Sequence, residues 1–593
     1  MHFTKPLVID HNEYKAVLKK KAVSAQSGQS LRAHDAASCK LPVHWDKPHT
    51  VWVAHDTQLI HAVKDMHASA MLVVVLRSDA LSALDGIALE HLGAYFESKR
   101  LVLVLGTEAE ALAQALSDLI NIDAFTGWQP IVDKALLDQD VDYFRVFYRS
   151  LAAKINIKNL YKATKIQTAY LFLRNALINA PLASRATDLQ PFHNAQLNKP
   201  VLIVAAGPSL NKQLPTLARY QHVFTILAVD TVWPILQKNG IVADMIFALD
   251  ARSKPSWPKD GVSGETCFAV DIGCAPALVW SHGQNHLFST TSASIRHLLQ
   301  GLGVHTEVLA TGGSVATTAF GFARHLGANP VVLIGQDLAL TGGKDHADGY
   351  LHAYEEDFLK ARTDKGFDVE GYYGDRVKTE KQLLFYKTWY ENQIASFPET
   401  LVINATEGGA KIAGSLQIPF LQVCQELEAF QKVKDFQFPR HVMRFDAAHL
   451  AQLSIRLGGL IDKTREFIEL AHQGELLIDR KGPRSRSKLL LGIDRLNDQL
   501  MSFDEDARFV VDAFSQVKMT QISYQTVTDT RDKTLDIAIG QYRKIYMGIQ
   551  ESGHLALAML QEISALYGRL SERKAYDPIL LSALQVTPAL PTA

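Results

Sequence analysis

Short runs of consecutive apolar residues alternate with amphipathic stretches through the first two thirds of the chain. The first three runs are VWVAH (51–55), MLVVVL (71–76) and LVLVLG (101–106). Runs that are apolar on both faces are typical of parallel strands covered by helices. We therefore expect a small N-terminal α/β domain over residues 1–140. No glycine turn suited to a phosphate follows its strands, which favours a structural or partner-binding role over a second catalytic domain.

A helical pattern over residues 141–182, ended by Pro181, leads into the most regular part of the chain. The runs VLIVAA (201–206), FTILAVD (224–230) and MIFALD (245–250) alternate with helices and predict a βαβαβ unit. Three further runs predict more strands: CFAVDI (267–272), HLFST (286–290) and VVLIGQD (331–337). The expected fold is a central Rossmann-like parallel sheet over residues 141–414, leading helices included.

Beyond residue 414 the apolar residues take a heptad-like spacing without strand runs, so we expect an all-α C-terminal domain over residues 415–593. A chain of 593 residues is too long for one core, which agrees with several domains. Its 61 Lys and Arg balance 62 Asp and Glu, so no overall positive charge attracts nucleic acid. Four cysteines without C-x-x-C spacing, no secretory h-region and no apolar stretch of membrane length predict a cytoplasmic protein without a membrane span.

The first candidate site is the turn Gly207-Pro208-Ser209, between an apolar strand run and a helix. Glycine permits a tight turn, proline fixes φ, and serine can cap the helix or donate to a phosphate oxygen. The helix N-terminus favours an anion. The alternative is an ordinary turn between a strand and a capped helix.

Two neighbouring strand runs end in acids, Asp230 followed by Thr231, and Asp250. Ligands of open α/β sheets bind at the carboxyl ends of their strands. These residues could contact ribose hydroxyls, a base edge or a metal, or they could only cap the next helices.

A second glycine turn, TGGS at 311–314, precedes another helix and could hold a second anion through Gly313, Ser314 and Thr317. An ordinary serine cap is the alternative. After the strand run at 331 come Gln336 and Asp337, and then a segment dense in glycines and titratable groups. It contains Thr341, Gly342, Gly343, Lys344, Asp345 and His346. Lys344 could counter a phosphate or carboxylate, and His346 or Asp337 could take a proton from a hydroxyl.

Four segments, in this order, resemble the motility-associated-factor family of bacterial flagellin glycosyltransferases. They are VAAGPSLNKQL, LAVDTVWPILQKNGIVADMIFALD, TGGSVATTAFGFARHLGANPVVLIGQDLALTGGKDHADG and INATEGGAKIAG, within residues 199–414. The resemblance implies inverting transfer of a nonulosonic acid, such as pseudaminic or legionaminic acid, from its CMP-activated form to Ser/Thr of flagellin. It also implies a sialyltransferase-like central domain between a small N-terminal and a helical C-terminal domain.

Under this resemblance Gly207, Pro208 and Ser209 hold the CMP phosphate, and Asp230, Thr231 and Asp250 line the cytidine end. Gly313, Ser314 and Thr317 meet the sugar carboxylate, and the loop from Thr341 to His346 closes over the site. His346, Asp337 and Lys344 are the catalytic candidates, and the sequence does not choose between His346 and Asp337 as the base.

A second branch of the superfamily is similar to archaeal 6-hydroxymethylpterin diphosphokinase, which would use ATP and Mg²⁺, with Asp230, Asp250 or Asp337 on the metal. Its activity does not call for large flanking domains, so we favour the transferase. A non-catalytic flagellin chaperone or scaffold is the hypothesis from another class. No metal site or cofactor is assigned from the sequence, and it leaves the sugar, the acceptor, Mg²⁺ dependence and the oligomeric state open.

Overall fold

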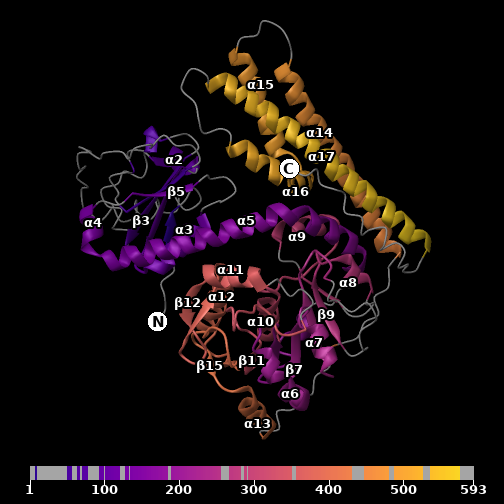
Figure 1. Ribbon diagram of the computed structural model, residues 1–593. Helices are drawn as coiled ribbons and strands as arrows, with labels where there is room; N and C mark the ends of the chain where they lie inside the picture. Colours follow the sequence, from indigo (N-terminus) through magenta and orange to yellow (C-terminus); the bar gives the residue numbers. More distant parts are fainter. Residues whose placement is uncertain are drawn as a thin grey trace, which may run out of the picture. The chain divides into compact units, whose positions relative to one another are not determined.

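The computed structural model describes most of the chain as two compact units, Met1–Lys165 and Ile166–Ala593 (Figure 1). The described residues are 7–9, 50–55, 60, 63–66, 70–77, 92–98, 100–119, 127–131, 134–183, 189–254, 266–281, 286–289, 292–349, 356–429, 438, 447–479, 486–524 and 534–573.

The first unit contains a five-stranded sheet in the order β1-β4-β3-β2-β5. Its strands are β1 (Leu7–Ile9), β2 (Thr50–Ala54), β3 (Met71–Arg77), β4 (Leu101–Gly106) and β5 (Gly127–Ile131). β1 is antiparallel to β4, and the other pairs are parallel. The helices α2 (Gly93–Glu97), α3 (Ala109–Leu119) and α4 (Lys134–Gln139) accompany it. The three predicted strands and the α/β class are confirmed, whereas β1 and β5 were not predicted.

Helix α5 (Val141–Ala183) contributes residues to both units. It covers the predicted helical pattern and continues past Pro181 to Ala183. The expectation that Pro181 ends the helix is therefore wrong by part of a turn. Pro181 has no N–H to donate to the carbonyl of Leu177, four residues before it, and Tyr567 donates to that carbonyl instead.

The second unit is built on an eight-stranded, fully parallel sheet in the order β10-β9-β8-β7-β6-β11-β14-β15. Its strands are β6 (Val201–Val204), β7 (Thr225–Val229), β8 (Met245–Ala248), β9 (Cys267–Asp271), β10 (His286–Ser289), β11 (Val331–Ile334), β14 (Val402–Asn404) and β15 (Leu416–Gln417). From β6 the chain adds strands in one direction as far as β10 and then returns to the other side of β6 with β11. The order therefore reverses between β6 and β11, where open α/β sheets bind ligands.

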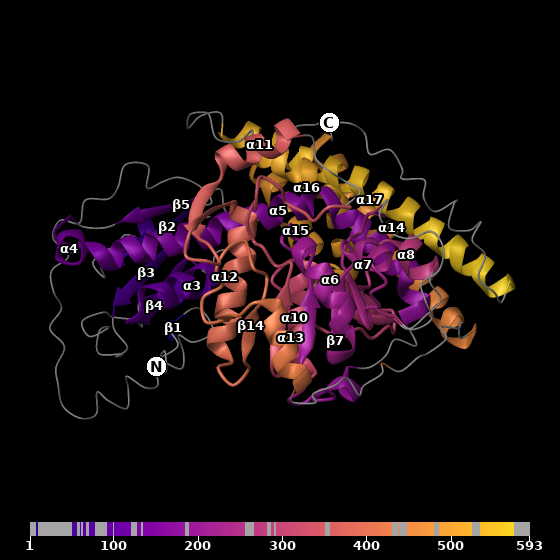
Figure 2. The same cartoon turned by 60° about the horizontal axis from the view of Figure 1, so that its bottom comes forward.

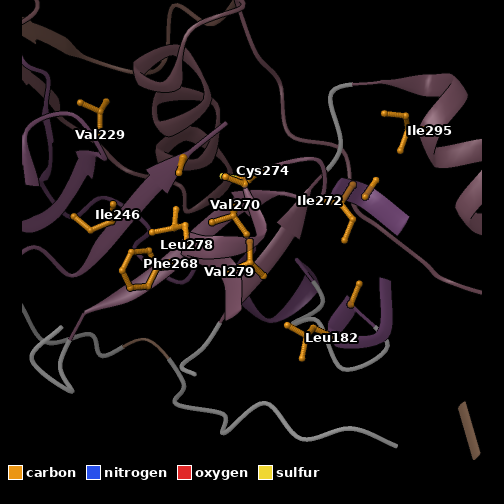
Figure 3. Close-up of a cluster of buried hydrophobic side chains, with 14 of the residues drawn as sticks. Leu182, Val229, Ile246, Phe268, Val270, Ile272, Cys274, Leu278, Val279 and Ile295 are labelled. Carbon is orange, nitrogen blue, oxygen red and sulfur yellow. The ribbon is translucent and has the colours of Figure 1, made fainter. Parts of the chain in front are cut away.

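Helices and one hairpin surround this sheet. They are α6 (Leu210–Tyr220), α7 (Trp233–Lys238), α8 (Pro276–Ser281), α9 (Ala293–Gly301), α10 (Val315–His325), α11 (Glu356–Lys365), α12 (Lys381–Ser396) and α13 (Phe420–Ala429), with the hairpin β12 (Phe367–Glu370) and β13 (Arg376–Thr379). Alternate residues of β8 enter opposite cores: Ile246 belongs to one and Phe247 to the other. Figure 3 shows Phe268 and Val270 of β9 near Leu278 and Val279 of α8 in the first of these cores. Burial on both faces explains the uninterrupted apolar runs of the sequence.

The part of the chain that the structure describes beyond β15 is helical, as predicted. It comprises α13, α14 (Ala447–Asp479), α15 (Arg486–Ser502), α16 (Glu505–Tyr524) and α17 (Thr534–Arg573). Helices α14 and α17 lie side by side in both views (Figures 1 and 2). Tyr567 of α17 donates a hydrogen bond to the carbonyl of Leu177 on α5, and Arg174 Nη2 lies 3.3 Å from Glu562 Oε1. These helices therefore share a core with one face of the eight-stranded sheet.

Candidate functional site

A glycine turn and a buried carboxylate meet at the reversal point of the eight-stranded sheet. Ser209 Oγ, at the start of α6, donates to Asp337 Oδ2 at 2.6 Å, and Ser209 N lies 3.2 Å from Asp337 Oδ1. Asp337, which follows β11, is only 2% exposed. Its carboxylate therefore occupies the anion position that the sequence predicted for a phosphate.

Gly207 is required at this contact for steric reasons. A Cβ at this position would lie 2.1 Å from Asp337 Oδ2 and 2.5 Å from the carbonyl oxygen of Gly335. The Gly207 amide also donates to that carbonyl at 2.7 Å. The absence of a side chain thus lets the backbone of the turn approach the chain that leaves β11.

Burial raises the pKa of Asp337 above its ordinary value of 3.8. Contacts with Ser209 and Thr341 and the charge of Lys212 offset only part of this effect. Asp337 therefore accepts a proton more readily than an exposed aspartate does.

The loops after β6, β11 and β14 are joined at this edge of the sheet. Ala347 N donates to the carbonyl of Ala206 at 2.8 Å, and Ala410 N donates to the carbonyl of Asp337 at 2.7 Å. Gln213 Nε2 donates to the carbonyls of Ala405 and Thr406. Gln213 had no visible signal in the sequence, because a single glutamine in a helix shows nothing of its partners.

The predicted acids after β7 and β8 are brought together by a residue that was not predicted. Lys254 Nζ lies 2.8 Å from Asp230 Oδ2 and 2.6 Å from Asp250 Oδ2, and it also donates to Thr231 Oγ1 at 3.3 Å. Asp230 is fully buried, whereas the side chain of Asp250 is 53% exposed. Asn175 of α5 donates to the carbonyl of Ala251 at 2.8 Å and so holds the loop that carries this group.

The second glycine turn makes a capping box. Ser314 caps α10, and Thr317 Oγ1 accepts hydrogen bonds from the amides of Gly312 and Ser314 at 2.9 and 3.1 Å. Gly313 has a φ of 86°, which favours glycine. A Cβ on Gly312 would lie 2.4 Å from the indole of Trp389, so α12 covers this turn. The arrangement includes the predicted cap, and a role toward a sugar carboxylate stays a prediction.

The loop after β11 places His346 beside an acid. His346 Nδ1 lies 3.1 Å from Asp345 Oδ1, and Asp345 Oδ2 accepts from Arg362 Nη1 at 2.6 Å. Arg362 also pairs with Glu380 Oε1 at 2.6 Å. Burial alone would raise the pKa of Asp345, but the contacts with His346 and Arg362 outweigh it and hold the pKa below its ordinary value. Asp345 is thus an anion that Arg362 holds beside the imidazole of His346.

Lys344 differs from its loop neighbours, because it pairs with Asp348 at 2.7 Å and both side chains are exposed. Gly342 and Gly343 have φ angles of 61° and 74° and form a tight turn between Thr341 and Lys344. Nothing lies within 4 Å of a Cβ added to either glycine, so the conformation, and not a lack of space, requires them.

Comparisons with known proteins agree with this fold. A solved structure described as a MAf glycosyltransferase from Magnetospirillum magneticum AMB-1 matches 97% of this chain and 86% of that one, with a TM-score of 0.55 and 15% identity. The fold is that of a MAf glycosyltransferase. Residues 174–343 match the family model described as 6-hydroxymethylpterin diphosphokinase MptE-like. The predicted resemblance, with its MptE-like central region, is confirmed.

Two curated relatives are uncharacterized proteins of Treponema pallidum (strain Nichols). One is 32% identical over 90 residues, which cover 15% of this chain and 42% of the relative. The other is 48% identical over 103 residues and covers 15% of this chain and 26% of the relative. The chain thus spans less than half the length of either relative. None of the helices in the described ranges has both the length and the apolar character needed to cross a membrane.

Proposed function

We propose that the chain is a glycosyltransferase that moves a nonulosonic acid from its CMP-activated form to Ser/Thr hydroxyls of flagellin. The observation that carries the proposal is the likeness of fold to a MAf glycosyltransferase over 97% of the chain. The polar groups gathered at the carboxyl edge of the eight-stranded sheet support it, because a scaffold has no need of a buried acid, a bridged acid pair and an oriented histidine.

The donor lies along this edge in the proposal. Asp250 accepts from hydroxyls at the cytidine end, since it is the exposed member of its pair. The phosphate lies outside the turn of Gly207, Pro208 and Ser209, because the Asp337 carboxylate already accepts the Ser209 hydrogen bonds. Gly313 and Ser314 face the sugar carboxylate, while Thr317, which is fully buried, holds their turn in place. The Thr341–His346 loop covers the donor.

His346 is the proposed base that takes the proton from the acceptor hydroxyl. Its side chain is 31% exposed, so a protein hydroxyl can reach it, and Asp345 orients the ring. Asp337 is the weaker candidate, because it is 2% exposed and both of its oxygens lie within hydrogen-bonding distance of Ser209 N.

The match of residues 174–343 to the MptE-like model favours a second candidate, an ATP-dependent pterin diphosphokinase. The central region is common to both candidates, so its match does not separate them. They differ in the nucleotide that they bind.

Isothermal titration with CMP, and separately with ATP and Mg²⁺, distinguishes the candidates. We expect CMP to bind and ATP not to bind. A Ser209→Ala variant should weaken CMP binding, because the hydrogen bond that holds the turn against Asp337 is lost. Selective ATP binding would transfer the proposal to the kinase, and binding of neither would favour the flagellin scaffold.

A further inference from the structure

Lys254 stands between two carboxylates at the ends of β7 and β8. Its ammonium contacts the fully buried Asp230 at 2.8 Å and the half-exposed Asp250 at 2.6 Å. The Lys254 side chain is itself only 17% exposed. Burial alone would lower the pKa of this amine, but the two aspartates outweigh it and raise the pKa, so Lys254 is a cation throughout the physiological range.

These carboxylates do not fit a divalent metal. Magnesium requires oxygen ligands at about 2.0–2.1 Å in nearly octahedral geometry. Lys254 contacts the oxygen atoms Oδ2 of Asp230 and Asp250 that such an ion would need, and the third predicted ligand, Asp337, is held by Ser209. A metal would have to displace a buried ammonium from both partners, which leaves that charge uncompensated.

The surroundings show why a cation is needed here. Burial and the charges of Asp230, Asp250 and Asp271 together raise the pKa of the Cys274 thiol. Three carboxylates therefore act on the same small volume. Without a counter-ion they would repel the phosphate of any nucleotide that approaches this edge.

We propose that Lys254 is an internal counter-ion that takes the place of a divalent metal, so that the nucleotide donor binds at this edge without metal. The identity of the nucleotide rests on the proposed function, whereas the replacement of the metal by Lys254 does not. Asp250 keeps its exposed side free to accept hydrogen bonds from sugar hydroxyls of the nucleotide.

The first arm of the test uses Mn²⁺ alone and follows bound metal by electron paramagnetic resonance. We expect the wild-type protein to bind no Mn²⁺ that depends on Asp250. Mn²⁺ bound to the wild type and lost in Asp250→Asn would overturn the inference. This arm needs no nucleotide, so it holds even if CMP fails to bind and the proposed function is wrong.

The second arm measures CMP affinity in the presence of EDTA. Lys254→Met should raise the Kd for CMP at least about tenfold, because Asp230 and Asp250 lose their charged hydrogen-bonding partner. Lys254→Arg should restore most of the affinity. Lys387→Met, which breaks the Lys387–Glu391 pair on α12, is the matched control and should leave the Kd unchanged. Unchanged affinity in Lys254→Met, or wild-type binding that requires Mg²⁺, contradicts the inference. Thermal unfolding confirms that each variant is folded.

Discussion

His55 follows β2 in the five-stranded sheet, and Asp230 follows β7 in the eight-stranded sheet. Both strands are fully buried, and each is apolar after a first threonine. The ring of His55 contacts Phe144, Phe147 and Tyr148 of α5 edge-on, and its Nε2 lies 3.0 Å from Tyr148 Oη. Asp230 instead pairs with a lysine that also contacts an exposed acid. Strands of one kind thus end in an aromatic contact in one unit and in a charged group with a half-exposed acid in the other.

The largest expected effect is on turnover and concerns His346, in a loop of the eight-stranded sheet. In a transfer assay with a CMP-activated nonulosonic acid and flagellin, His346→Ala should lower kcat by about 10²–10⁴-fold, because general base catalysis is lost. CMP affinity should be unchanged. Asp345→Asn should lose part of the same factor, and Asp345→Glu should regain some of it, because Asp345 acts by orienting the ring.

Asp348→Asn is the control for this series, since Asp348 is an exposed acid of the same loop. It should keep full turnover. Turnover that is unaffected by His346→Ala would remove His346 as the base and leave Asp337 as the candidate.

The second prediction concerns His55, which follows β2. Burial lowers the pKa of His55 from 6.5 to about 4, against a backbone contact with Val75. The unfolded chain therefore binds more protons than the folded unit between these values, and stability falls as the pH drops from 6.5 toward 4. The difference corresponds to about 3 kcal/mol. Hydrogen exchange of the β2–β4 amides should show about 2 kcal/mol of this loss in the wild type between pH 7.5 and 5, because pH 5 lies inside the interval.

His55→Phe keeps the aromatic packing and removes the titration, so its exchange should change less between the two pH values. The amides of β6 and β7 in the other unit serve as the internal reference. Equal pH dependence in the variant and the wild type would mean that His55 is not the group responsible.

The third prediction tests the close approach at Gly207. Gly207→Ala should destabilise the second unit by about 1–3 kcal/mol, because its Cβ overlaps Asp337 and Gly335. Gly459→Ala is the matched control, because nothing lies within 4 Å of a Cβ added to Gly459 in α14. Alanine there should stabilise the helix by about 0.5–1 kcal/mol. Urea unfolding measures both. If Gly207→Ala were as stable as the wild type, the turn would be less closely packed than the structure has it.

The strands and the positions of Asp230, Asp250 and Asp337 at their ends could be predicted from the sequence, because apolar runs and the residues after them are local features. Their partners could not. Lys254 is an ordinary lysine in the sequence, and only the loops after β7 and β8 bring it to both acids. The bond between Ser209 and Asp337 joins residues 128 positions apart, so no spacing pattern reveals it.

The smaller elements of the second unit were missed for a related reason. The hairpin β12–β13 and the strands β14 and β15, at one side of the sheet, are short. β12 is largely exposed and β13 is partly exposed, so the sequence shows no long apolar run at the hairpin. The buried strand β14 still carries the turn with Gly409, whose φ of 70° lets it pack against the backbone of Asp337. The resemblance to a family included this segment, whereas its apolar pattern did not reveal it.

The smallest expected effect concerns Asp337 itself. Because its pKa is raised in the folded protein, the stability that its protonated form contributes is complete below about pH 3.8 and is lost as the pH rises through the raised value. Asn cannot titrate and keeps an oxygen that accepts from Ser209. The stability of Asp337→Asn relative to the wild type should therefore increase with pH over this interval and then stay constant. The increase should be smaller than the His55 effect, because the contacts with Ser209 offset part of the effect of burial on the pKa of Asp337. Urea unfolding measured in steps from pH 3.5 to 7 follows the difference, with Asp348→Asn as the exposed control. A relative stability that decreases with pH would mean that the Ser209 hydrogen bonds outweigh burial, so that Asp337 binds a proton less readily than an exposed aspartate and is a poorer alternative base.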